Sequence, residues 1–232
     1  MNATTTTKPK TTTTKPKTTT TKAPPVSKPY FTPEALELYI SSYQNQTFRK
    51  YIRYVGNKTV GIIGSPMEGD YETLSQLIND LSSLLPNVNF SLVSGEGDIT
   101  YNFLDRSSFI SSEECDDERL FYSSSGWHSG NEATSNDFCF KIGDHYKESF
   151  DTTNEQTIKE CRIYHLRASF LWALTSSWRD ADREKYPNSY FASMYCNNYQ
   201  KISYLDRQVL LIHYSEYVAN ATTVDEVYNL LK

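Results

Sequence analysis

The stretch that decides the fold is "NEQTIKECRIYHLRASFLWALTSSW", residues 154–178. Its apolar side chains recur at the spacing of one helix face, at Ile158, Cys161, Tyr164, His165, Ala168, Leu171, Trp172 and Thr175. This pattern predicts a long amphipathic helix that ends in a loop near Trp178. It is the longest helical stretch of the chain, and the elements before it indicate what it packs against.

Five elements are expected between residues 32 and 104, upstream of this helix. A helix begins with a Thr32 cap and Pro33 in its first turn, and "KTVGIIG" (58–64) is typical of a buried strand. "DYETLSQLINDLSSLLP" (70–86) places six apolar residues on one helical face. "NVNFSLV" (87–93) and "DITYNFL" (98–104) alternate as strands do. The order strand, long helix, strand, strand predicts a sheet with a helix packed on it.

The remaining elements complete an α+β chain. Residues 107–136 are polar and predict a long loop or a loose hairpin, followed by a strand over 137–144. "LDRQVLLIHYSEYV" (205–218) and "TVDEVYNLLK" (223–232) predict two short helices, with Asp206 and Thr223 as plausible caps. The chain has 18 Tyr, and a tyrosine buries well only if its hydroxyl finds a partner or water. We therefore expect aromatic residues near the edges of the core.

The first 29 residues differ in composition from the rest. "TTTTKPK" occurs twice in tandem (4–17), and such Thr- and Pro-rich sequence cannot bury enough apolar area to fold. We expect a stalk or linker over residues 1–29, of the composition that carries O-linked glycans, and one folded domain over residues 30–232. A tail without a role and a tail that binds polyanions through its lysines are the alternatives.

Charge and hydropathy exclude two classes of partner. The net charge is −5, yet six Lys and no acid precede residue 34, which leaves −11 for the folded part. An acidic domain argues against nucleic acid, because phosphate binding needs a cationic face. No apolar run approaches the roughly 20 residues of a membrane helix, and no signal peptide is visible. Since other features look extracellular, we expect a signal peptide to have been removed.

The cysteines and glycosylation motifs favour a secreted protein. Four widely spaced cysteines without a CxxC pair predict two disulfides, rather than a zinc ribbon or a thioredoxin motif. We predict the pairs Cys115–Cys139 and Cys161–Cys196 among three connectivities; four buried thiols in a reducing compartment are the alternative. N-x-S/T motifs, which also arise by chance in an Asn- and Thr-rich chain, occur at Asn2, Asn45, Asn57, Asn89 and Asn220.

The order of elements resembles the zincin fold, in which a twisted mixed sheet carries a helix and is followed by an active-site helix and a C-terminal helical part. The last third of the chain, with "YPNSYF" (186–191) and "ISYLDRQVLLIHY" (202–214), is similar to the secreted zincin-like domain-of-unknown-function family 2927. That family's pattern reads "dSIF…LS-x-x-D-R-x-L-L-x-x-LY". The stretch "FRKYIRYVGNKTVGIIG" (48–64) resembles its N-terminal half.

The resemblance implies a degenerate zinc site. Laid on the zincin motif H-E-x-x-H-x-x-G-x-x-H/D, the chain has Ala168 and Trp172 at the two histidines, Ser169 at the general base and Trp178 at the third ligand. Zinc hydrolysis needs imidazoles four residues apart and a base, and these side chains supply neither. We expect Trp172, Leu171 and Leu174 to fill the core, so that Trp172→Ala costs about 3–5 kcal/mol.

Other chemistry is weakly represented. The histidines at 128, 145, 165 and 213 show no HExxH spacing, and we expect His165 and His213 to be half-buried on helices and His128 to lie in a loop. A metal site assembled from these scattered histidines is the alternative. No G-x-S-x-G elbow is present, and "GIIGSPMEG" (61–69) lacks the lysine of a P-loop.

The sequence therefore predicts a non-catalytic, zincin-like extracellular domain without metal or cofactor, displayed on a glycosylated stalk. It would act as a structural surface protein or bind an extracellular protein or glycan. A divergent metallopeptidase, or another hydrolase with an unrecognised site, is the alternative.

Overall fold

A computed structural model describes residues 27–44, 50–105, 107–108, 122–129, 132–141, 154–177, 181–192, 196 and 201–232. Its strands are β1 (Gly56–Gly64), β2 (Val88–Ser94), β3 (Ile99–Leu104), β4 (Tyr122–Ser129) and β5 (Glu132–Lys141). Its helices are α1 (Pro33–Ser41), α2 (Asp70–Leu84), α5 (Glu155–Thr175), α6 (Tyr204–His213), the short 3₁₀ helix η1 (Glu216–Val218) and α7 (Val224–Leu231). Of the predicted stalk, residues 1–26 lie outside this described part.

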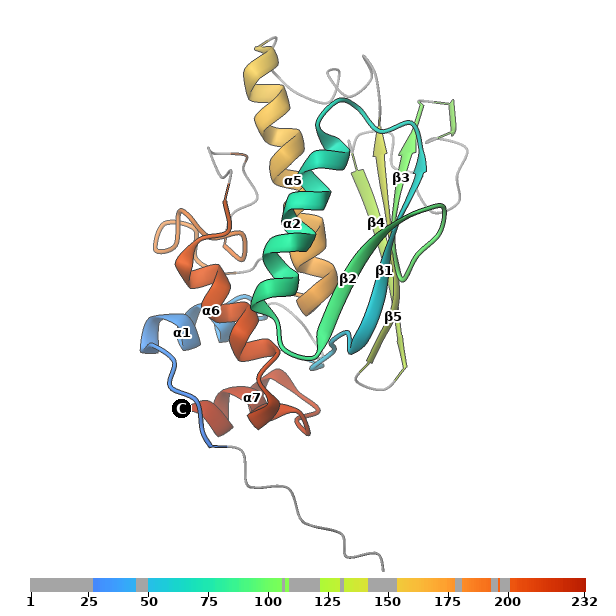
Figure 1. Ribbon diagram of the computed structural model, residues 1–232. Helices are drawn as coiled ribbons and strands as arrows, with labels where there is room; N and C mark the ends of the chain where they lie inside the picture. Colours follow the sequence, from blue (N-terminus) through green and yellow to red (C-terminus); the bar gives the residue numbers. More distant parts are fainter. Residues whose placement is uncertain are drawn as a thin grey trace, which may run out of the picture.

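The five strands form one mixed sheet in the order β2-β1-β3-β5-β4 (Figure 1). Strands β2, β1, β3 and β5 are parallel, and β4 pairs antiparallel with β5 at one edge. The parallel strands need crossover connections, and α2 supplies the one between β1 and β2. The sheet with a packed helix that the element order predicted is confirmed, but its four parallel strands give a mixed α/β arrangement in place of the predicted α+β class.

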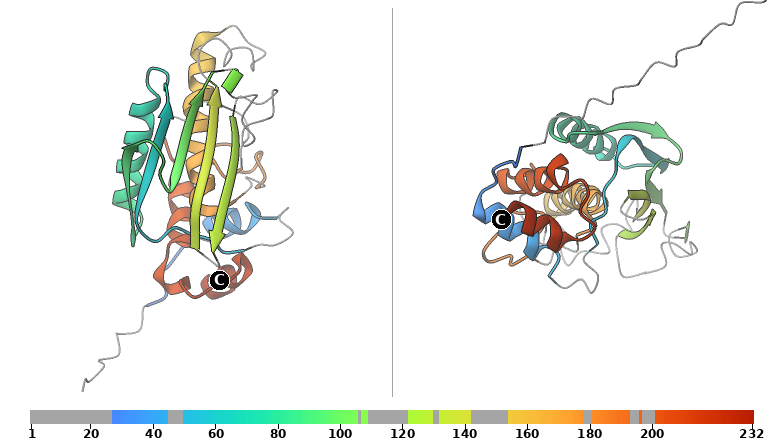
Figure 2. Two further views of the ribbon diagram at one scale, coloured as in Figure 1. Left: turned by 90° about the vertical axis from the view of Figure 1, so that its right-hand side faces the viewer. Right: turned by 90° about the horizontal axis from the view of Figure 1, so that it is seen from below.

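The helices cover the sheet unequally. Helices α2 and α5 pack against each other on the same face, and the left view of Figure 2 shows the opposite face, with α5 behind the strands and α2 at one side. We call this opposite face the open face. Helices α1, α6 and α7 gather at the end of the sheet where β1 begins, and α1 contacts both of the others. The Nζ of Lys28, before α1, donates to the backbone oxygen of Lys232, after α7, at 2.8 Å.

The helix starts follow from capping residues. Thr32 caps α1 by accepting from the backbone N–H of Ala35, and Thr223 forms a capping box with Glu226 on α7, as predicted for both caps. The prediction that Asp206 caps α6 is wrong. Ser203 is the cap, and Asp206 is the third helical residue, whose carboxylate returns to the backbone of Ser203. The helix therefore begins at Tyr204, one residue before the predicted start.

Residues 107–136 were predicted to form a long loop or a loose hairpin, and the hairpin is confirmed for the C-terminal part of this range. Strand β4 pairs with β5 from Tyr122 to Ser129, with an irregularity between Trp127 and His128. Strand β5 begins at Glu132, five residues earlier than predicted. Its polar first half does not show a strand pattern, but it pairs with β4 along its length and with β3 from Asn136 onward. Pairing with neighbouring strands therefore overrides local propensity here.

Tyrosines occupy the centre of the core, and the expectation that they lie near its edges is wrong. Eight have less than 2% of their surface exposed: Tyr39, Tyr43, Tyr51, Tyr54, Tyr101, Tyr164, Tyr190 and Tyr214. The last carbonyls of a helix have no partner within the helix. Tyr43 and Tyr214 donate to the oxygens of Thr175 and Leu174 at the end of α5, and Tyr51 donates to the oxygen of His213 at the end of α6. Helix ends thus supply the partners that buried hydroxyls require.

The β2–β3 connection crosses the open face of β1. A Cβ atom on Gly61 would lie 2.2 Å from the backbone oxygen of Gly95, and one on Gly97 would lie 2.5 Å from the nitrogen of Gly61. Backbone therefore touches backbone at the crossing, and only glycine fits at both positions. This contact lets β3 lie on the other side of β1 from β2.

Candidate functional site

The residues at the first zinc-ligand position and the base position, Ala168 and Ser169, lie inside the protein. Their exposed fractions are 1% and 2%. The Ser169 hydroxyl donates to the backbone oxygen of Leu166 at 3.0 Å, and the hydroxyl of Tyr101 on β3 lies 3.1 Å from it. Burial raises the pKa of Tyr101, while the contact with Ser169 lowers it by less. Both hydroxyls are neutral and join α5 to the sheet.

Trp172, at the second ligand position, is only partly buried. Its indole meets the ring of Phe138 edge-on, with centroids 5.8 Å apart. Leu171 and Leu174 are buried as predicted. The expectation that Trp172 is also fully buried in the core is wrong. The sheet surface already carries the rings of Phe138 and Tyr101, 5.2 Å apart, so the indole lies at the border of the core. Trp178 lies outside the described residues.

His213 is completely buried, where half-burial was expected. Its Nε2 donates to the backbone oxygen of Ile52 at 2.7 Å, so Nδ1 is free of a proton and accepts from the hydroxyl of Tyr39 at 3.3 Å. The rings of Tyr43 and Tyr51 complete the surroundings. Burial lowers the pKa of His213 to about 3, against the smaller opposing effect of the bond to Ile52. The imidazole is neutral and joins α6 to the segment before β1.

Of the other histidines, His165 is the one whose side chain the structure describes. His165 is buried on α5, again more than expected, and its ring meets Tyr164 edge-on at 5.0 Å. His128 belongs to strand β4, so the expectation that it lies in a loop is wrong; only its backbone is described. His145 lies outside the described residues. Within the described part of the chain, no three His, Cys, Asp or Glu side chains are grouped as metal ligands would be.

The residues that carry the family resemblance meet at one carboxylate. Asp206 is fully buried and accepts from the hydroxyls of Ser189 at 2.6 Å and Ser203 at 2.8 Å. It also accepts from the backbone N–H groups of Tyr190 and Ser203, both at 3.1 Å. Burial raises the pKa of Asp206, and these four donors counteract that rise. The motif holds the loop before α6 against the start of that helix.

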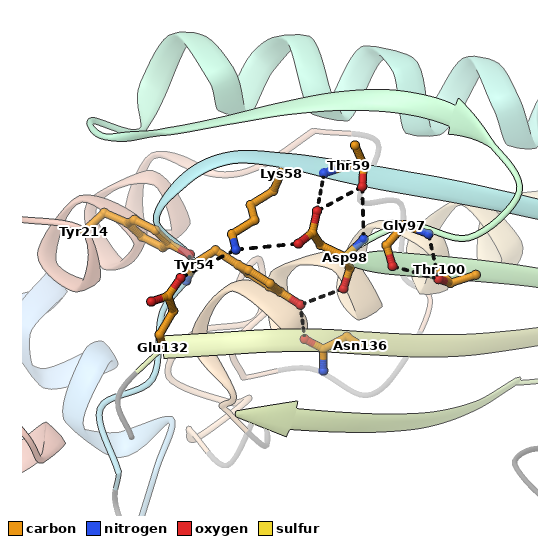
Figure 3. A network of polar contacts seen from close by, with 9 residues as sticks. All are labelled: Tyr54, Lys58, Thr59, Gly97, Asp98, Thr100, Glu132, Asn136 and Tyr214. Carbon is orange, nitrogen blue, oxygen red and sulfur yellow. Dashed lines mark hydrogen bonds and ion pairs between the residues drawn. The ribbon is translucent and has the colours of Figure 1, made fainter. Parts of the chain in front are cut away.

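A second polar network lies at the amino ends of β1, β3 and β5 (Figure 3). The Lys58 Nζ lies 3.6 Å from carboxylate oxygens of both Asp98 and Glu132, and Asp98 accepts from the N–H and hydroxyl of Thr59. Partial burial raises the pKa of Asp98, but the Thr59 bonds and Lys58 outweigh it and leave the pKa below its usual value. Ligand sites of α/β sheets lie at the opposite, carboxyl ends of the strands. We therefore interpret this network as structural, because it connects the amino ends of β1, β3 and β5.

Near the carboxyl ends of the strands lies a buried ion pair that sequence reasoning missed. Arg162 on α5 binds the carboxylate of Asp70, the first residue of α2, through Nε at 2.7 Å and through a second nitrogen. The guanidinium also lies over the rings of Phe103 and Phe140, at 5.6 and 5.8 Å from their centroids. The sequence signal that could have revealed this pair is Arg162, a charged residue one turn after Ile158 on the apolar face of the predicted helix.

The cysteine prediction is confirmed for one pair. Cys161 on α5 and Cys196 form a disulfide, with Cα atoms 4.6 Å apart. Cys139 is buried on β5 and is also disulfide-bonded. Its predicted partner Cys115 lies outside the described residues, so that pairing stays a prediction. The confirmed bond ties the longest helix to the segment before α6.

The glycosylation motifs at Asn57, Asn89 and Asn220 lie at exposed positions. Asn57 and Asn89 are on the open face of the sheet, on the neighbouring strands β1 and β2. Asn220 follows η1. Asn2 and Asn45 lie outside the described residues.

One cavity lies away from all of these networks, where the segment before α1 meets α7. It has a volume of about 560 Å³, and Tyr30, Phe31 and Tyr228 are among the residues that line it. Lys28 and Lys232 also line it.

Among the described helices, none combines the length and apolarity needed to cross a membrane. In comparisons with known proteins, the chain matches no protein-family model and no curated protein.

Proposed function

We propose that this chain is a non-catalytic, extracellular zincin-like domain that acts as a binding or structural surface protein. One observation carries the proposal: Ser169, at the position of the general base, is buried and bonded to Tyr101. A catalytic base needs access to water and substrate. Here the hydroxyl instead connects β3 to α5, which is a packing role.

The arrangement of elements supports the zincin-like part of the proposal. A twisted mixed sheet carries α2 on one face, α5 follows β5 on that same face, and α6 and α7 make a C-terminal helical part. This is the order that the resemblance implies. The meeting of Ser189, Ser203 and Asp206 adds to it, because the family pattern places a serine, a second serine and an aspartate at these positions.

The proposal that the protein is extracellular rests on a disulfide and on glycosylation motifs. A disulfide between a buried helix residue, Cys161, and a distant loop residue persists in oxidising compartments. Three glycosylation motifs at exposed positions fit the same compartment. The acidic folded part favours an extracellular protein or glycan over nucleic acid as the partner.

Metal content and peptidase activity test the proposal together. The full chain is purified without chelator, its zinc is measured by elemental mass spectrometry, and its activity is measured on a mixed peptide library. We expect substoichiometric zinc, no cleavage, and a melting temperature that neither added zinc nor a chelator changes. A Ser169→Ala variant is the matched control, because it removes the hydroxyl without adding a ligand.

Stoichiometric zinc with cleavage that a chelator abolishes would overturn the proposal in favour of a divergent metallopeptidase. Cleavage that is indifferent to the chelator would point to another hydrolase and would equally contradict it. Loss of that cleavage in Ser169→Ala would place Ser169 at the site, and unchanged cleavage would place the site elsewhere.

A further inference from the structure

Two glycosylation motifs that are 32 residues apart in the sequence lie side by side in the sheet. The parallel register of β1 and β2 pairs Asn57 with Asn89 and Thr59 with Ser91. Both complete motifs, Asn-Lys-Thr and Asn-Phe-Ser, are therefore aligned residue by residue. Nothing in the linear sequence indicates this alignment.

The two asparagine side chains touch. The Nδ2 of Asn89 donates to the Oδ1 of Asn57 at 3.4 Å, and both residues are exposed on the open face. The neighbours of Asn89 along β2, Val88 and Phe90, point to the helix side and are buried. Strand alternation fixes this orientation, so both amides point outward from one spot.

We propose that Asn57 and Asn89 form a single glycan position, which carries one N-linked glycan, and never two, in the folded protein. This inference rests on the extracellular part of the proposed function. The modification forms a bond from Nδ2 to the anomeric carbon of a lipid-pyrophosphate-linked sugar, while Nδ2 loses a proton and the lipid pyrophosphate leaves. Either amide presents the required nitrogen.

Crowding limits the position to one sugar. Neighbouring strands are about 4.8 Å apart, and a substituted pyranose ring is wider than that spacing. Two rings attached to touching side chains that point the same way would overlap in the side-chain positions of this structure. Transfer of the sugar precedes folding, so a doubly modified chain would have to turn both side chains apart or loosen the β1–β2 pairing as it folds.

The position also has a structural consequence for the sheet. Strand β2 is the outermost strand in the order β2-β1-β3-β5-β4, so its outer side has no strand neighbour in the described sheet. Exposed edges invite pairing with other chains, and natural proteins obstruct them. A glycan on Asn57 or Asn89 would cover the open face beside this edge and direct partners to other surfaces.

The test is a count of glycans on the secreted, folded full chain from a eukaryotic host. Wild type, Asn57→Gln, Asn89→Gln and the double variant are compared by intact mass before and after enzymatic deglycosylation. Deglycosylation in heavy-oxygen water marks each used asparagine. Asn220→Gln is the matched control, since its exposed motif is in a separate turn after η1.

We expect each single variant at 57 or 89 to keep the wild-type number of glycans and the double variant to lose one. Asn220→Gln should lose a glycan independently of the pair. A folded species with sugars on both Asn57 and Asn89 would overturn the inference, as would the absence of sugar from both. Failure of the extracellular part of the proposed function is read separately, because it would leave Asn220 without sugar as well, whereas failure of the inference alone would leave the Asn220 glycan in place.

Discussion

The hydroxyl oxygens of Tyr101 and Ser169 lie 3.1 Å apart in the core, where β3 meets the middle of α5. We expect Ser169→Glu, which restores the general base of a zincin, to lower the free energy of unfolding by about 3–5 kcal/mol, because it buries an uncompensated carboxylate. Ser169→Ala should cost only about 1 kcal/mol, the net value of a neutral hydrogen bond. Urea unfolding of both variants measures the difference, and a Ser169→Glu variant as stable as wild type would show that the position is open to water.

Trp172 and Leu171 are neighbours on α5 with different burial, which allows a direct comparison. Leu171→Ala should cost about 3 kcal/mol, because a leucine with 1% exposure leaves a cavity. Trp172→Ala should cost about 2 kcal/mol, less than the sequence alone predicts, since part of the indole already contacts water. Thermal and urea unfolding report both values. A larger loss at Trp172 than at Leu171 would contradict this order.

The neutral His213 makes stability depend on pH in a defined direction. The unfolded chain binds a proton at this side chain near pH 6.5 and the folded chain only near the pKa of about 3. Between these values the unfolded state holds more protons, so stability rises with pH and is fully present above 6.5. The contribution has a limiting slope of about 1.4 kcal/mol per pH unit.

The His213→Gln variant isolates this contribution. Its amide can donate to Ile52 and accept from Tyr39 but does not titrate. Urea unfolding of both proteins between pH 4 and 7.5 should show a shallower acid dependence for the variant. Parallel curves for the two proteins would mean that His213 does not remain neutral on folding.

The disulfide between Cys161 and Cys196 spans 35 residues. Loop-closure entropy for that length predicts a loss of about 3–4 kcal/mol when both cysteines are replaced by serine. Unfolding of the double variant in non-reducing buffer measures it. Wild type with a reductant is not an equivalent control, because Cys139 is also disulfide-bonded.

Local signals in the sequence predicted most of the helices and strands, because caps and periodicity act over a few residues. Thr32, Thr223 and the apolar spacing of α2 and α5 are of this kind. The start of β5 at Glu132 was not predictable in this way, since pairing with β4, and not its own residues, imposes the extended conformation there. The complete burial of His213 likewise depends on tyrosines far away in sequence, Tyr39 and Tyr51.

The candidate site was likewise predictable only in part from the sequence. The absence of zinc ligands at 168 and 172 was visible in the sequence, but the use of Ser169 as a partner for Tyr101 needed the contact between strand and helix. The Asp70–Arg162 pair was missed because its residues are 92 positions apart. The alignment of Asn57 with Asn89 required the register of β1 and β2.

The bond between the Lys28 ammonium and the Lys232 carbonyl brings the two ends of the described domain together. Domains with adjacent ends tolerate circular permutation and insertion into other proteins. A short flexible linker between these ends, with new termini at an exposed turn, should therefore leave the sheet and its helices intact. The same geometry means that a pull on both ends would load α1 and α7 first and would reach the sheet only after these helices had separated.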